Sequence, residues 1–137
     1  MTLAVVPPER LQFWETALVP WLEAVERRSK GRESVVDLLN GIAEQRYQLW
    51  LWHRHAELRA IAVTEVLVHA GGAKVCRIRI CTGRDRHEWL AEGMEAIADW
   101  ALRIGCQAVE PVCRRGWERE LRRLGYRCTH LVMEKVL

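Results

Sequence analysis

The first third of the chain carries its apolar side chains at helical spacing. Over residues 9–25 they recur every three or four positions, as in a helix with one buried face, and two prolines stand just before its start. Pro20 lies inside this pattern and should kink or split the helix, because proline removes a backbone hydrogen bond. Ser34 and Asp37 form a weak capping box ahead of a second, shorter helix over residues 35–42.

The middle of the chain changes to a two-residue alternation, which is typical of strands. The pattern predicts strands over residues 46–53, 58–68 and 74–82, with Gly71 and Gly72 turning the chain before the third. Strands that follow one another through short connections form an antiparallel meander. In the third strand we expect one face to carry Cys76, Ile78 and Ile80, and the other to carry Val75, Arg77, Arg79 and Cys81.

The last part of the chain alternates helices with strands. The pattern predicts a helix over 90–104 capped by Gly105, a strand over 106–112, a short helix over 115–124 and a final strand over 126–136. A strand joined through a helix to another strand makes a right-handed parallel crossover. The expected fold class is therefore α+β: a central mixed sheet, part antiparallel meander and part parallel crossover, flanked by helices.

Composition bounds the size and setting of this fold. With 137 residues, 50% apolar and 28% charged, the chain fits one globular domain over residues 1–137 with a single core. The five cysteines are scattered and include no Cys-x-x-Cys pair, so neither a disulfide framework nor a zinc knuckle is indicated. Because no leader pattern and no run of about 18 apolar residues occurs, we expect a cytoplasmic, reducing setting and no membrane partner.

Arginines provide the clearest charge pattern, although a net charge of +3 does not by itself indicate nucleic-acid binding. Arg115, Arg119 and Arg122 share one face of the predicted short helix, which is either a solvated face or a surface that binds phosphates or an acidic protein. Arg77 and Arg79 share a strand face, where burial is costly unless the charges are paired. We therefore expect one of two arrangements. Either the face is open and contacts another subunit, or it binds an anionic ligand.

Metal and nucleophile chemistry have little support in the sequence. The histidines at 53, 55 and 69 lack a carboxylate or cysteine at a spacing that completes a ligand set, so we expect no metal site. Cys81 and Cys113 act as nucleophiles only beside a base, and no pattern identifies one. We expect both cysteines to be buried thiols with a structural role.

Three stretches of sequence, together with the order of the predicted elements, resemble the GNAT acetyltransferase family. They are Ala98–Cys106, Gly116–Trp117 and Leu121–Tyr126, which resemble the family's ending of helix, Gly-Cys, strand, short helix, Leu-Gly-Phe/Tyr and strand. The resemblance covers about half the chain, from Gly71 to Leu137, and implies the family's mixed fold. It also implies acetyl-CoA as the cofactor of a catalytic member, bound by a loop ahead of the long helix.

The loop that the resemblance assigns to the cofactor departs from the family pattern. The resemblance implies that acetyl-CoA contacts Thr82, Gly83, Arg84, Arg86 and His87. Of the family's glycines only Gly83 is present, while His87 and Trp89 stand where the family has small residues. We expect those two side chains to occupy space that the phosphates need.

The acid and base positions differ as well. Leu121 stands where many family members have a tyrosine that protonates the leaving thiolate, and leucine cannot donate a proton. No motif locates a catalytic base, and Glu65 in a predicted strand is the nearest candidate.

The altered loop favours a GNAT-like protein of phage or prophage type with a non-catalytic structural, assembly or binding role, because phage-encoded relatives include virion and assembly proteins. Its arginine faces would contact protein subunits or an acidic partner, in a homo-oligomer or larger particle, in the host cytoplasm or a virion. The alternative is an acetyl-CoA-dependent N-acetyltransferase acting on an amine, with solvent or Glu65 as base. A second alternative is a nucleic-acid-binding accessory protein that uses the face from Arg115 to Arg123. Nucleic acid is a less expected partner than protein subunits or an acidic partner.

Overall fold

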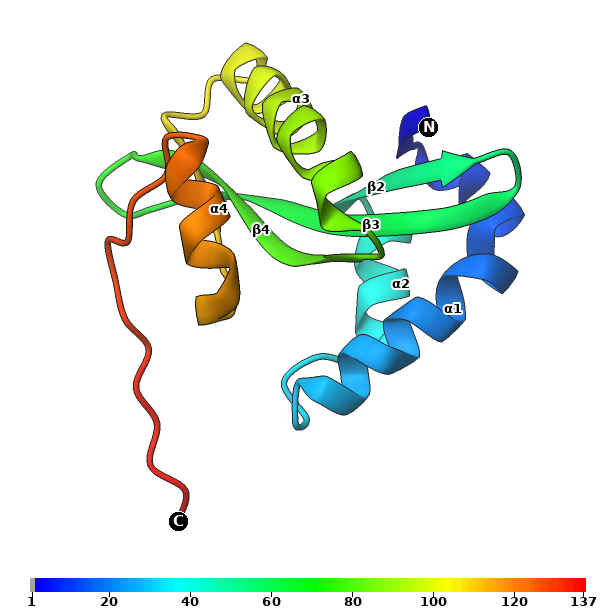
Figure 1. Ribbon diagram of the computed structural model, residues 1–137, viewed down its shortest axis with the longest axis horizontal. Helices are drawn as coiled ribbons and strands as arrows, with labels where there is room; N and C mark the ends of the chain where they lie inside the picture. Colours follow the sequence, from blue (N-terminus) through cyan, green and yellow to red (C-terminus); the bar gives the residue numbers. More distant parts are fainter. Residues whose placement is uncertain (1) are drawn as a thin grey trace.

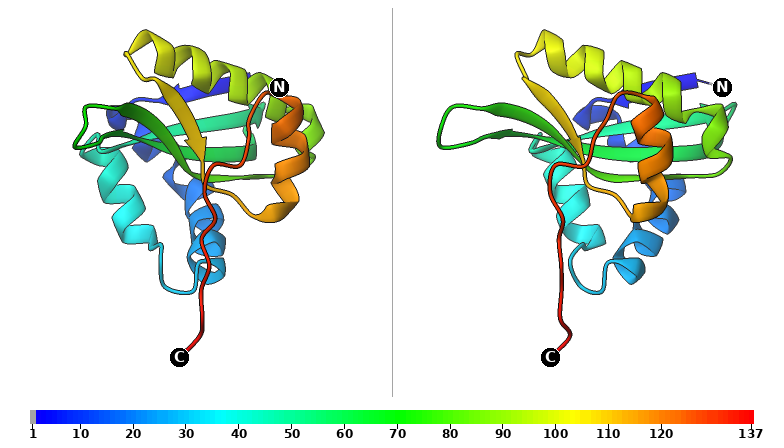
Figure 2. Two further views of the ribbon diagram at one scale, coloured as in Figure 1. Left: turned by 90° about the vertical axis from the view of Figure 1, so that its left-hand side faces the viewer. Right: turned by 60° about the vertical axis from the view of Figure 1, so that its left-hand side comes forward.

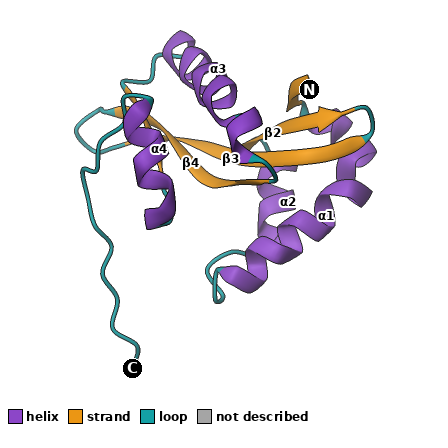
Figure 3. Cartoon of the chain, in the orientation of Figure 1, coloured by secondary structure: helices purple, strands orange, loops and turns teal. Residues whose placement is uncertain are grey.

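The structure, a computed structural model, describes residues 2–137 and is built around a five-stranded sheet (Figures 1 and 3). In spatial order the strands are β1 (Thr2–Val6), β2 (Tyr47–Arg54), β3 (Glu57–Val68), β4 (Lys74–Gly83) and β5 (Ala108–Pro111). Strands β1 to β4 pair antiparallel with their neighbours, and β5 pairs parallel with β4. The predicted α+β class, with a meander and a parallel crossover, is confirmed.

Strand β1 is not predicted by the sequence pattern. Its five residues are too few to establish an alternation, and the strand forms by pairing with the distant β2, from Thr2 opposite His53 to Val6 opposite Leu49. A pairing partner so far away in sequence leaves no local signal.

Helices cover both faces of the sheet, as Figure 1 shows. One face carries α1 (Leu11–Arg28) and α2 (Val35–Ala43), and the other carries α3 (Leu90–Arg103) and α4 (Glu118–Arg123). Short 3-10 segments precede three of these helices: η1 (Pro8–Arg10), η2 (Arg86–Glu88) and η3 (Arg115–Trp117). No helix within residues 2–137 is long and apolar enough to cross a membrane.

Helix α1 continues through Pro20, so a split at this residue is a wrong prediction. Leu18 and Leu22, on either side of the proline, are fully buried against the sheet. Each buried leucine contributes about 1.5–3 kcal/mol, so their packing offsets the roughly 3 kcal/mol that an interior proline costs a helix. The predicted cap of α2 is present, since the Asp37 N–H donates to Ser34 Oγ at 3.0 Å.

The sheet has a core on each face rather than a single one. Between the sheet and α1–α2 lie mainly aliphatic side chains, among them Leu49, Leu51, Ile61 and Val63. The core under α3 and α4 is rich in tryptophan and includes Trp50, Trp52, Trp89, Met94 and Ile97.

A β-bulge at Arg79 changes which face of the sheet the end of β4 presents. Val63 pairs with Ile80, and the next residue of β3, Thr64, pairs with Ile78, so Arg79 is an extra residue on β4. Ile80 is consequently buried in the α1–α2 core, and Cys81 lies against the α3 core. The predicted faces are therefore wrong for Ile80 and Cys81, because an inserted residue reverses the alternation beyond it.

The chain after α4 forms no strand among the described residues, which corrects the strand predicted over 126–136. Tyr126 still packs against the α3-side core, but from Arg127 onward every residue is exposed. Figure 2 shows this segment extending away from the sheet to the C-terminus. A segment whose composition favours a strand does not form one unless another backbone lies beside it and pairs with it.

Candidate functional site

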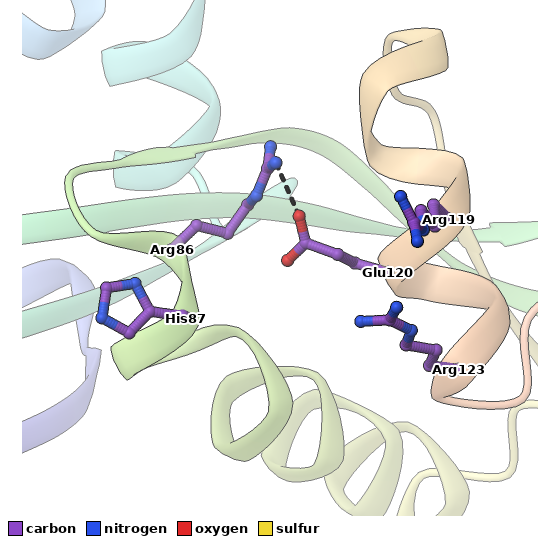
Figure 4. Close-up of a pocket in the computed structure, with 5 residues that line it drawn as sticks. All are labelled: Arg86, His87, Arg119, Glu120 and Arg123. Carbon is purple, nitrogen blue, oxygen red and sulfur yellow. Dashed lines mark ion pairs between the residues drawn. The ribbon is translucent and has the colours of Figure 1, made fainter.

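A cavity of about 530 Å³ opens between the loop ahead of α3 and helix α4. Five side chains line it: Arg86, His87, Arg119, Glu120 and Arg123 (Figure 4). The first two come from η2 and the other three from α4. The crossover connection thus brings together charged residues that are more than thirty positions apart in sequence.

The cavity carries a surplus of positive charge. Arg86 is held in place, since its guanidinium forms an ion pair with Glu120 at 2.6 Å and lies 4.6 Å from the centre of the Trp117 ring. Arg119 and Arg123 are exposed, and neither forms an ion pair with any residue between 2 and 137. Two guanidinium groups are therefore available to an anionic ligand, and guanidinium is the side chain best suited to phosphate oxygens.

The first turn of α3 adds backbone donors beside this cavity. The helix has 14 residues, and its N-cap residue, Trp89, provides no side-chain hydrogen bond to the open N–H groups. Asp85, just before η2, has a left-handed backbone with φ of 51°, so the loop turns sharply between β4 and α3. An uncapped helix N-terminus beside cationic side chains favours a bound anion.

Trp89 lies inside the protein and not on the ligand side of this loop. Its side chain is 1% exposed, its ring centre is 5.1 Å from that of Trp52, and its indole N–H donates to the backbone oxygen of Arg84 at 2.8 Å. Gly83 makes room for it, because a Cβ there would come within 2.8 Å of Trp89 Cζ2. The expectation that Trp89 obstructs the phosphate site is therefore wrong, and His87 is exposed at the cavity wall.

The remaining loop residues that the resemblance assigns to the cofactor lie outside the cavity. Thr82 accepts a long hydrogen bond from Arg28 at 3.4 Å, and Gly83 is packed against Ala60 and Trp89. Arg84 lies 5.9 Å over the Trp21 ring, on the side of α1. Of the five predicted contacts, the structure brings only Arg86 and His87 to the cavity.

The arginine face predicted on the last helix is divided by the structure. Arg119 lines the cavity, whereas Arg122 is paired with Glu118 at 2.7 Å on the exposed surface and Arg115 is exposed in η3. The sequence placed Arg123 only at the end of the face considered for nucleic acid and not among the anion contacts, although its position four residues after Arg119 places both on one helical face. The spacing of these two arginines was the available signal.

The arginines of β4 are paired with carboxylates. Arg79 forms ion pairs with Glu33 at 2.9 Å and Glu65 at 3.1 Å, with its guanidinium 4.9 Å over the Tyr47 ring. Burial opposes its charge, but the two carboxylates raise the pKa of Arg79 above its ordinary value. Arg77 pairs with Glu110 of β5 at 3.5 Å. Both arginines of this face therefore have an ion-pair partner within the chain.

Glu65, the candidate base, belongs to this ion-pair group. It is 14% exposed, and its Oε1 accepts a hydrogen bond from Arg79. The pairing of β4 with β5 ends at Ile78 and Pro111, so Arg79, the next residue, places this group where the two strands separate.

Two thiols of β4 are poor nucleophiles. Burial raises the pKa of Cys81 to about 12 and that of Cys76 to about 11, so both remain protonated at neutral pH. Leu121 is buried in the α3-side core, and burial also raises the pKa of the nearby Tyr126. No group of three histidine, cysteine or acidic side chains suited to a metal ion occurs within residues 2–137.

Comparison with known proteins finds a likeness in structure. No family model matches the chain, and no curated protein matches it. Among solved structures, a ribosomal-protein-alanine N-acetyltransferase from Brucella melitensis has a TM-score of 0.68 at 12% identity, covering 100% of this chain and 99% of the other.

Two further solved structures share the whole architecture. An aminoglycoside acetyltransferase from a soil metagenomic sample, in complex with sisomicin, has a TM-score of 0.71 at 10% identity over 99% of this chain and 94% of its own. A glucosamine-6-phosphate N-acetyltransferase from Arabidopsis thaliana has a TM-score of 0.62 at 14% identity over 99% of both chains. The likeness extends well beyond the C-terminal half that carries the resemblance in sequence, and the chain has the GNAT acetyltransferase fold.

Proposed function

We propose that this protein is an acetyl-CoA-dependent N-acetyltransferase that acts on an amine. The observation that carries the proposal is the cavity beside the uncapped start of α3, where Arg119 and Arg123 have no ion-pair partner among residues 2–137. The solved structures of this fold named above are acetyltransferases by name, which supports the enzymatic alternative over the non-catalytic role that the altered loop favours.

The residues of the cavity fit the cofactor. Coenzyme A carries a diphosphate and a ribose phosphate, and these need several cationic and N–H donors close together. Arg86 is fixed by Glu120 and Trp117, while Arg119 and Arg123 are free to bind phosphate oxygens. Since the Trp89 side chain is directed into the core, the absence of the family's glycines does not close the site.

Acetyl-CoA, when bound, would supply an activated acetyl thioester. The residues that would receive an amine lie where β4 leaves β5, on the α1–α2 side of the sheet. There Glu33 and Glu65 share one cation, Arg79, so the group has a surplus of negative charge that favours a protonated amine. Only Oε1 of Glu65 contacts Arg79, which leaves Oε2 available to accept the amine's proton, directly or through water.

No tyrosine serves as the acid in this proposal. Leu121 is buried in the α3-side core, and its hydrocarbon side chain has no proton to donate. We propose that water protonates the departing thiolate, which is a modest requirement because a thiol has a pKa near 8.5 and leaves readily as its anion at neutral pH.

Titration calorimetry with acetyl-CoA tests the cofactor site. The double variant Arg119→Ala/Arg123→Ala should bind at least tenfold more weakly, because a hydrogen bond to a charged group contributes roughly 1.5–3 kcal/mol. Its matched control is Arg115→Ala/Arg127→Ala, which removes the same charge from exposed residues outside the cavity and should bind normally. Absence of acetyl-CoA binding by the unaltered protein would contradict the proposal.

A thiol-release assay over a panel of primary amines tests the reaction itself. The unaltered protein should release coenzyme A faster than background with at least one amine. Glu65→Gln should lower that rate without changing the affinity for acetyl-CoA, since Glu65 lies on the opposite face of the sheet from the cavity. Background rates with every amine would reject the enzymatic function even if the cofactor binds.

A further inference from the structure

A second cavity, of about 300 Å³, lies between the edge strand β1 and the C-terminal half of α3 and is called the β1–α3 pocket here. Its walls come from three elements and include Leu3 and Val5 of β1, Trp50 of β2, and Asp99, Trp100 and Arg103 of α3. It shares no residue with the cavity between η2 and α4, so the proposed cofactor does not account for it. Its volume is at the lower end of the range for small-molecule sites, which suits a ligand the size of one amino acid.

The apolar wall of the pocket is formed where the α3 side of the sheet is incompletely covered. Leu3 and Val5 are two positions apart on β1 and therefore face the same side. Leu3 packs against the α3-side core, whereas Val5, which pairs with Trp50, is 49% exposed. An apolar surface beside α3 is therefore open to a ligand.

Two tryptophans give the pocket a fixed aromatic corner. The rings of Trp50 and Trp100 lie 5.6 Å apart, centre to centre, and meet at 78°. The Trp50 indole N–H donates to Oγ1 of the buried Thr64 at 3.0 Å, and that hydroxyl donates to Gln48 at 2.8 Å. Because these bonds hold the Trp50 ring before any ligand arrives, packing against it costs little further side-chain entropy.

Opposite charges stand together on the helical wall of the pocket. Asp99 and Arg103 are exposed and lie one turn apart on α3, in the order in which an acid and a base pair most favourably. Neither forms an ion pair or a side-chain hydrogen bond with any residue between 2 and 137, although both line the same cavity. The pocket therefore presents an unpaired carboxylate and an unpaired guanidinium beside an apolar surface.

We propose that the β1–α3 pocket binds a free α-amino acid with a large apolar side chain. Asp99 accepts hydrogen bonds from the α-ammonium group and Arg103 donates to the α-carboxylate, both of which are charge-assisted contacts. The apolar side chain of the ligand packs in the corner between Trp50 and Trp100. A hydrocarbon would use neither charge, and a simple amine or acid would use only one. This site does not depend on the acetyltransferase function.

Titration of the full chain with L-phenylalanine, followed by NMR, tests the site. We expect saturable shifts of the backbone amides of Leu3, Val5 and Ala96 and of the Trp100 indole N–H, with a dissociation constant at or below about 1 mM. Shifts that do not saturate in this range would overturn the proposal. So would shifts confined to the cavity between η2 and α4 or to the surroundings of Glu65.

Two analogues that each lack one charge identify the ligand class. Phenethylamine has no carboxylate and hydrocinnamate has no ammonium group, so each should bind at least tenfold more weakly than L-phenylalanine. Asp99→Asn should weaken L-phenylalanine and phenethylamine but not hydrocinnamate. Arg103→Gln should weaken L-phenylalanine and hydrocinnamate but not phenethylamine. This crossed pattern cannot arise from a general loss of folding, and equal binding of L-phenylalanine and either analogue would overturn the proposal.

Two further variants separate the pocket from the rest of α3. Ala96 lines the pocket and is half-buried. Ala96→Leu fills the space without changing a charge and keeps a good helix former, so it should weaken L-phenylalanine at least tenfold. The matched control is Glu95→Gln, which removes an exposed carboxylate one turn before Asp99 and outside the pocket, and it should bind normally. A loss with Glu95→Gln equal to that with Asp99→Asn would overturn the assignment.

Discussion

The Trp89 indole N–H donates to the Arg84 backbone oxygen at 2.8 Å and so closes the loop that leads from β4 into α3. The same bond keeps the indole turned into the core. A residue that looks in sequence like an obstruction is therefore part of the support of the cavity in which we propose that the cofactor binds.

Replacing Trp89 with phenylalanine should loosen this loop. Trp89→Phe keeps an aromatic ring in the core but removes the hydrogen-bond donor, and we expect a loss of about 1 kcal/mol beyond the effect of ring size, with weaker acetyl-CoA binding. Trp52→Phe is the matched control, because Trp52 is equally buried and its Nε1 has no partner among the described residues. Urea denaturation and calorimetry measure the two quantities, and equal effects of both substitutions would contradict the role of the bond.

Gly93 is required by the packing of α3 on the sheet. A Cβ at this position would come within 2.7 Å of Trp52 Cε2, inside the α3-side core. Gly93→Ala should therefore destabilise the protein by about 1–3 kcal/mol through overpacking, although alanine is the better helix former. Gly71→Ala is the control, since nothing lies within 4 Å of its added Cβ, and it should be neutral or slightly stabilising. A stabilising Gly93→Ala, measured by thermal unfolding, would refute this packing.

The ion pairs of β4 predict that replacing Arg79 destabilises the protein more than replacing Arg77. Arg79→Ala leaves Glu33 and Glu65 without their shared cation, and both are less than one fifth exposed, so we expect a loss of about 2 kcal/mol or more. Arg77→Ala removes a more exposed pair with Glu110 and should cost less than about 1 kcal/mol.

A compensating change distinguishes charge from packing at Arg79. Adding Glu33→Gln to Arg79→Ala removes one of the two stranded charges, and it should recover part of the stability in urea denaturation. No recovery would show that the aliphatic part of Arg79, and not its charge, matters at this position.

Because the Cys76 thiol is buried, we expect the free energy of unfolding to fall at alkaline pH. Burial raises its pKa from 9.0 to about 11, so between these values the unfolded chain releases the proton while the folded protein retains it. The stabilising contribution is complete below pH 9 and is lost as the pH rises toward 11, at up to about 1.4 kcal/mol per pH unit. Urea denaturation from pH 8 to 10.5 should show a flatter profile for Cys76→Ala. Identical slopes would exclude this thiol as the cause.

The sequence predicts the parts of the fold whose signals are local. Helix α3 shows a complete apolar stripe and a glycine stop, and its predicted range, 90–104, differs from the structure by one residue. The alternation of β2, β3 and β4 is equally clear. Strand β1 and the bulge at Arg79 depend on pairing with distant residues, which no pattern within a short window records.

The candidate site was harder to predict for a related reason. Arg86 and His87 came from the resemblance of the loop, but their neighbour Arg123 is brought to them only by the crossover through α3 and β5. The direction of the Trp89 side chain depends on the space that Gly83 leaves beside Ala60. Such packing relationships cannot be derived from the spacing of residues along the chain.

The strand order, β1-β2-β3-β4-β5, is also the order of the strands along the sequence. Each of the strands β2 to β5 therefore pairs with the strand synthesised just before it, and β2, β3 and β4 follow one another through short connections. Such a topology favours rapid folding from the β2–β4 meander outward. Strand β5 must wait for α3 to complete the one parallel crossover, so we expect the β4–β5 edge to be the last part of the sheet to acquire protection against hydrogen exchange.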